Sequence, residues 1–136
     1  MPVNLLAVVG AAVANMVVGM LWYSPAVFGK MWMGLSGLNT QKMNEMKRKG
    51  MAKSYLISFA GALVMSYVLA VFLGYSTAAN VSEALQVAFW LWLGFLATTM
   101  LGSILWESKP TKLYLLNVLH YLISMFVMSV ILFVWV

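Results

Sequence analysis

The chain has few side chains that could do chemistry, and they lie in its first and last apolar stretches. Asn15 lies in the first stretch, and Asn117, His120 and Tyr121 lie close together in the last. Their spacing places the last three on one face of a helix. A neutral imidazole donates from one ring nitrogen and accepts at the other, and an amide can pair with either. These residues predict a small polar site, or a point that passes protons or water.

The same residues also have a structural interpretation. Hydrogen bonds between helices inside a membrane are worth about 0.6 kcal/mol on average, so Asn15, Asn117 and His120 could simply clamp the first and last helices together. An ionisable residue inside lipid is costly and marks a functional site by default. Both hypotheses, the clamp and the functional site, are carried forward.

Several chemistries are excluded by what the chain lacks. The 136 residues include no cysteine, one histidine and three acidic residues. None of the three acidic residues lies within one of the long apolar stretches, so a Ser-His-acid triad lacks its acid, and zinc and di-iron sites lack their ligand sets. We expect no enzymatic activity, no metal and no cofactor. Nucleic-acid binding is not indicated either, because the basic run lacks interleaved aromatic residues.

Composition places these residues in a membrane protein. Hydrophobic residues make up 64% of the chain and charged residues 8%, too little charge to cover the surface of a water-soluble domain. A membrane-spanning helix needs about 20 mainly apolar residues. Four such stretches predict a single all-α transmembrane domain over residues 1–136, an antiparallel four-helix bundle with spans at about 3–23, 55–75, 84–106 and 113–136.

The predicted spans bring polar residues to one depth. Asn15 lies about eight residues from the cytoplasmic end of its span, or roughly 12 Å, and His120 about seven residues, or roughly 10 Å. Thr98 and Gly61 fall at nearly the same level. We therefore expect one polar layer in the cytoplasmic half of the membrane.

The loops predict the orientation. Six basic residues lie between residues 24 and 53, whereas the loop after the second span has Glu83 and no basic residue. By the positive-inside rule the first and third loops are cytoplasmic and both termini lie outside. The cytoplasmic mouth of the bundle is then formed by Trp22, Tyr23, Ser24 and Pro25.

The first loop also predicts a surface for lipid headgroups. Phe28 and Trp32 share one face of a segment too short to span, so we expect a short amphipathic helix in the interface. The basic run Lys47, Arg48 and Lys49 should attract anionic headgroups by about 1 kcal/mol per charge. The alternative is that these charges only set the topology.

Small residues recur along two spans at a spacing that lets helices approach closely. Two such ridges are more than one four-helix bundle needs, so we expect a homo-oligomer. The packing residues are Ser58, Gly61 and Ala62 in the second span and Gly94 and Gly102 in the third.

The stretch NLLAVVGAAVANMVVGMLWYSPAVFGKMWMGLSGL, with its Trp-Tyr-Ser-Pro and Phe-Gly-x-x-Trp elements, resembles an uncharacterised bacterial four-helix membrane family, a domain of unknown function. The end of the chain, LLNVLHYLISMFVMSVILFVW, is similar to that family's fourth span. The resemblance implies a bacterial inner membrane protein with four spans, and no established activity.

Two functional hypotheses follow. The first is a channel- or carrier-like conduit for a small solute, lipid or proton, with Asn15, Asn117, His120 and Tyr121 lining its polar layer and Trp22 gating its mouth. The second is a lipid-binding structural or regulatory protein that works through Trp32 and the basic run at the headgroup surface.

Overall fold

The computed structural model describes residues 3–24, 27–36, 45, 52–107 and 110–135. Within these residues the chain is helical and has no strand, and four helices are long and apolar enough to cross a membrane. This confirms the predicted all-α membrane fold. The four spans are α1 (Leu5–Trp22), α4 (Ala52–Ser76), the composite span Val81–Leu101 and α7 (Thr111–Val134).

Side-chain caps explain where two of the spans begin. The Oδ1 atom of Asn4 accepts hydrogen bonds from the backbone N–H groups of Leu6 and Ala7, at 3.1 and 3.3 Å. Asn80 does the same for the N–H of Glu83 at 2.9 Å, and the Glu83 carboxylate accepts from the Ala79 N–H at 2.6 Å. These bonds satisfy backbone donors that have no partner in the first turn of a helix.

The third span is not a uniform α-helix. It begins as α5 (Val81–Leu91), widens into the π-helix η1 (Trp92–Ala97), tightens into the 3-10 turn η2 (Thr99–Leu101) and ends as α6 (Gly102–Leu105). Two side-chain bonds hold the widened region to α7: Trp92 Nε1 donates to the Val118 carbonyl at 2.7 Å, and Tyr114 Oη to the Ala97 carbonyl at 2.5 Å.

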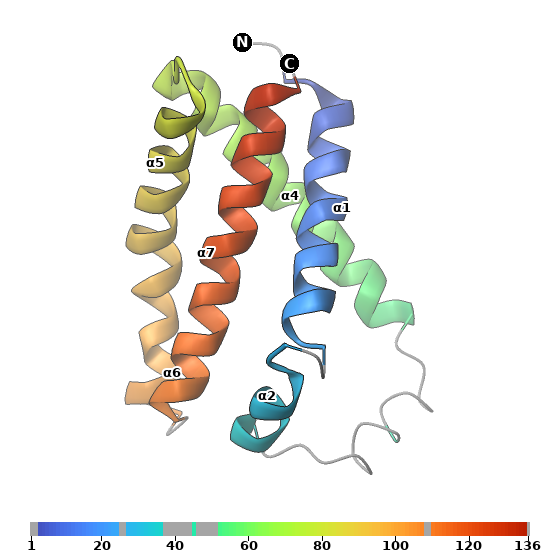
Figure 1. Cartoon of the computed structure of the whole chain (residues 1–136), viewed down its shortest axis with the longest axis vertical. Helices are drawn as coiled ribbons and strands as arrows, with labels where there is room; N and C mark the ends of the chain where they lie inside the picture. Colours follow the sequence, from blue (N-terminus) through green and yellow to red (C-terminus); the bar gives the residue numbers. More distant parts are fainter. Residues whose placement is uncertain (1–2, 25–26, 37–44, 46–51, 108–109, 136) are drawn as a thin grey trace.

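Helix α7 is the centre of the bundle. Consecutive spans run in opposite directions, with α1 and α5 on either side of α7 and α4 crossing obliquely behind (Figure 1). Both chain ends lie at one end of the bundle, called here the terminal end. The short helix α2 (Gly29–Ser36), which follows α1 as predicted, lies at the other, called the α2 end.

The oblique crossing of α4 over α1 depends on small side chains. Ala62 and Ser66 are buried on α4, and the Ser66 hydroxyl donates to the Val8 carbonyl of α1 at 2.9 Å. Small residues let two backbones approach this closely. The core beside the crossing consists of Ala7, Val8, Ala11, Leu69, Leu73, Ala84, Met128 and Leu132.

The other predicted packing residues do not lie between helices of this chain. Ser58 is exposed, and a β-carbon added at Gly61 or Gly94 would meet no atom of the described residues within 4 Å. At Gly102 it would meet only Trp106, at 3.7 Å, one turn along the same segment. The spacing of small residues predicts a ridge along α4. The tilt of α4 determines which part of that ridge packs against another helix.

We predict that Ala11→Leu destabilises the bundle by about 1–3 kcal/mol, because Ala11 is 0% exposed and extra methyl groups there overpack the core. Val13→Leu is the matched control, since Val13 lies on the same helix and is 47% exposed. Thermal unfolding in detergent would measure both. Equal unfolding temperatures for the two variants would contradict the packing described here.

Candidate functional site

The polar residues of α1 and α7 face each other over the half of the bundle nearer the α2 end. Gly19, Trp22 and Tyr23 of α1 surround the His120 ring, and Asn15 and Ser124 meet one turn further toward the terminal end. Asn15, Asn117, His120 and Tyr121, predicted to form one polar layer, are therefore on one helix interface. We call this interface, with Asn15, Gly19, Trp22, Tyr23, Asn117, His120, Tyr121 and Ser124, the α1–α7 site.

His120 is at the centre of the α1–α7 site and is 7% exposed. A β-carbon on Gly19 would lie 3.3 Å from Nε2 of the ring, so the missing side chain at Gly19 makes room for the imidazole. The role of Gly19 as the seat of the histidine required the coordinates, because helical spacing does not reveal which residue faces it.

Three aromatic rings surround the imidazole. The ring centroid of His120 lies 4.9 Å from that of Tyr121, 5.1 Å from that of Tyr23 and 6.2 Å from that of Trp22. Aromatic faces at about 6 Å or less attract a cation electrostatically. The imidazole therefore lies among aromatic rings, and no acidic side chain is among its contacts with the described residues.

The polar groups around His120 are paired with one another and not with the histidine. Tyr23 Oη donates to Asn117 Oδ1 at 2.7 Å, and the Ser124 hydroxyl donates to Asn15 Oδ1. Trp22 Nε1 donates to the Leu116 carbonyl at 3.1 Å. These three bonds join α1 to α7 and form the clamp that was one interpretation of the sequence.

The histidine itself takes no part in that clamp. Its Nδ1 and Nε2 atoms are both buried, and neither makes a hydrogen bond to any described residue. A buried polar atom without a partner costs about 1–3 kcal/mol. Such an atom needs an explanation, and a group that binds and releases something is one.

Phe28 and helix α2 cover the α1–α7 site at the α2 end. The Phe28 ring lies 4.6 Å from that of Trp22, and the Trp32 ring 5.4 Å from that of Tyr23. Gly29 makes this turn possible, since a β-carbon there would lie 2.5 Å from the Tyr23 carbonyl oxygen. Phe28 and Trp32, predicted to face lipid headgroups, thus pack on the aromatic residues around His120. We call these two residues the aromatic cap.

The remaining predicted residues lie outside the α1–α7 site. Thr98 is exposed on the third span and donates to the Gly94 carbonyl of its own helix at 2.7 Å, so it does not join the polar layer. Ser24 donates to the Leu21 carbonyl at 2.7 Å. Pro25, Lys47, Arg48 and Lys49 fall outside the described residues. No group of three His, Cys, Asp or Glu side chains able to hold a metal occurs in the described part of the chain.

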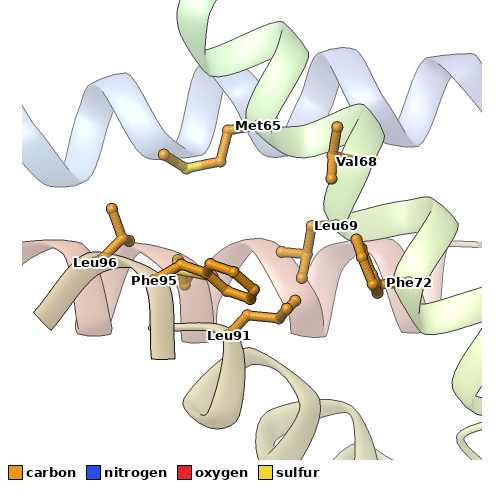
Figure 2. A pocket seen from close by; sticks show the side chains of 8 residues that line it. Met65, Val68, Leu69, Phe72, Leu91, Phe95 and Leu96 are labelled. Carbon is orange, nitrogen blue, oxygen red and sulfur yellow. The ribbon is translucent and has the colours of Figure 1, made fainter. Parts of the chain in front are cut away.

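An apolar pocket of about 400 Å³ lies on another face, between α4, the third span and α7 (Figure 2). It forms where tilted α4 separates from the widened η1, and neither the tilt nor the widening can be predicted from the spacing of apolar residues. All its side chains are apolar, so it offers contact with hydrocarbon and no polar chemistry. The lining residues are Met65, Val68, Leu69, Phe72, Leu91, Phe95, Leu96 and Met125.

This fold and the α1–α7 site define an all-α membrane protein with four candidate spans. Residues 6–133 match the family model described as Protein of unknown function (DUF1761). The chain belongs to this family, which confirms the resemblance to an uncharacterised family. No curated protein and no solved structure matched the chain.

We predict that Tyr23→Phe lowers the free energy of unfolding by about 0.6 kcal/mol, and by no more than ~1.7 kcal/mol, because it removes the bond to Asn117. Tyr55→Phe is the control, since Tyr55 is 52% exposed on α4 and makes the same chemical change. A double-mutant cycle with Asn117→Ala would measure the coupling. Strict additivity would contradict the bond.

Proposed function

We propose that this protein is a carrier-like conduit for protons and that His120 is the group that binds them. The observation that supports this is the pair of buried ring nitrogens without partners among the described residues, in a site where Tyr23 is paired with Asn117 and Ser124 with Asn15. Because those neighbours form the clamp, a purely structural role leaves the histidine unexplained. Intramembrane histidines are recurrent parts of proton relays.

The geometry favours a proton over a bulkier solute. His120 does not line the apolar pocket of Figure 2. A proton needs no cavity, because it adds to a ring nitrogen and makes the imidazole a cation. The rings of Trp22, Tyr23 and Tyr121 are close enough to stabilise that cation.

Access to the α1–α7 site is asymmetric. Toward the terminal end, α1 packs Ala7, Val8 and Ala11 against Met128 and Leu132, and the buried Ser66 hydroxyl there is bonded to the Val8 carbonyl. Toward the α2 end, the aromatic cap lies over Trp22 and Tyr23 and is the cover that the described residues provide. We therefore infer that protons reach His120 from the α2 end, past Trp22, and leave on the other side only after α1 and α7 rearrange.

The lipid-binding hypothesis has less support. Its aromatic residues, Phe28 and Trp32, pack on Trp22 and Tyr23, and its basic run lies outside the described residues. The homo-oligomer remains a proposal, supported by the open surfaces at Gly61 and Gly94.

The proton conduit is tested by flux into proteoliposomes that hold a pH-sensitive dye, with a potassium gradient and valinomycin imposing the voltage. We predict that His120→Gln slows proton entry by about 100-fold relative to the unaltered chain, as expected for loss of a positioned proton-transfer group. Gln86→Ala, at an exposed position of α5, is the control and should keep the full rate. An unaltered protein no faster than empty liposomes would overturn the proposal.

A spectroscopic readout separates loss of proton binding from loss of folding. The chain has one histidine, so nitrogen-15 labelling of histidine reports His120 alone. In lipid bilayers its resonances should change reversibly from the neutral to the protonated pattern as the pH falls. An imidazole that stays neutral in folded protein down to acid pH would exclude it as the proton site.

We propose further that the protein lies in a bacterial inner membrane with the α2 end in the cytoplasm and both termini outside. The described basic residues Lys30, Lys53 and Lys112 all belong to segments that begin toward the α2 end, which supports this orientation. Alkaline phosphatase fused to the C-terminus should be active, and green fluorescent protein fused there should be dark. The reverse pattern would invert the orientation.

A further inference from the structure

A second pocket lies at the terminal end of the bundle, far along the helices from His120. Its volume is about 430 Å³, and it lies between the start of α1, the last turns of α4 and the last turns of α7. The side chains that line it are of both kinds, unlike those of the wholly apolar pocket of Figure 2. We call it the terminal pocket, and it plays no part in the proposed proton conduit.

The terminal pocket has an apolar floor and a polar rim. Ala7, Leu73 and Leu132 belong to the buried core and form the floor. Tyr67 and Tyr75 lie on the exposed side of α4, at 47% and 79% exposed. Neither tyrosine hydroxyl is bonded to another of the described residues, so both are available to a ligand. The pocket thus offers hydrogen-bonding groups at its entrance and hydrocarbon contact below.

Local hydrogen bonds hold the walls of the terminal pocket in place. Asn4 Nδ2 donates to the Trp135 carbonyl at 3.3 Å, which ties the two ends of the chain together. The Trp135 ring lies over Gly10, where an added β-carbon would meet it at 2.7 Å. On the opposite side Thr77 has a φ of 51°, a left-handed conformation that ends α4 sharply. The pocket is therefore shaped without a ligand.

Charge restricts which ligand fits. None of the described residues that line the terminal pocket is charged. The described lysines lie on segments that begin toward the α2 end, and Glu83, at the start of α5, is at the same end as the pocket. An anionic headgroup would therefore find a carboxylate nearby and no described cation to pair with. Because the Glu83 carboxylate repels a second negative charge, a neutral head fits better than an anionic one.

We propose that the terminal pocket binds an uncharged amphiphile, a molecule with a hydroxyl-bearing head and one hydrocarbon chain. The head lies at the rim, where Tyr67 and Tyr75 can donate to it, and the first part of the chain lies against the floor. Tyrosine and tryptophan commonly occupy this depth because their rings have an apolar body and a polar tip. The terminal pocket does not include His120 and is separate from the proposed proton site.

The test uses two photoactivatable probes that carry the same diazirine-bearing acyl chain, a monoacylglycerol and a lysophosphatidylglycerol, added to the full-length protein in bilayers. Mass spectrometry locates the labelled residues. We expect the monoacylglycerol to label residues 67–78 and 132–135, and to do so more than the anionic probe at equal concentration. Equal labelling by both probes, or labelling spread over all lipid-facing helices, would overturn the proposal.

Two variants make the test specific. Ala70→Leu places extra methyl groups in the terminal pocket, and excess volume in an apolar pocket costs about tenfold or more in binding. Ala60→Leu is its matched control, on the same helix at an exposed position outside the pocket. Tyr67→Phe removes only a rim hydroxyl and should weaken labelling by about fivefold. Labelling that is the same in folded Ala70→Leu and Ala60→Leu proteins would refute the site.

Discussion

Hydrocarbon offers no hydrogen bonds, so every polar group on these helices must find a partner inside the protein. Several of them do so by reaching across to another helix. The Trp22 and Trp92 indoles donate to carbonyls of α7, Tyr114 of α7 donates to the third span, and Ser66 of α4 donates to α1. Three of these four bonds involve α7, the centre of the bundle. They also isolate His120, whose two ring nitrogens are the buried side-chain atoms left unpaired in the described part of the chain.

Much of the architecture could be predicted from sequence, because it follows from the apolar environment of the membrane and from the spacing of residues along a helix. Continuous apolar stretches predict the four spans, and spacings of three and four residues predict that Asn117, His120 and Tyr121 share a face. Asn15 of α1 was predicted to lie at the depth of His120, and in the structure it contacts Ser124 of α7, one turn from His120. What each of these residues does remains a proposal.

Other features depend on helix tilt and helix type, which a period cannot reveal. Depth alone placed Thr98 with His120, but the π-helical turns before Thr98 rotate the chain, and its side chain lies on the outer surface. The oblique course of α4 leaves Ser58 and Gly61 uncovered while burying Ala62. Phe28 and Trp32 were predicted to face lipid headgroups. In the structure their rings contact Trp22 and Tyr23.

The bond between Asn4 and the Trp135 carbonyl has a consequence for the order of the helices along the gene. Since α1 begins beside the point where α7 ends, and the two helices run antiparallel, a short peptide could join them and close the polypeptide into a ring. Cutting that ring between α2 and α4 would yield a circular permutant that starts with α4 and keeps α1 and α7 as neighbours. In such a rearranged chain His120 and Gly19 would lie in one helical hairpin, formed by α7 and then α1.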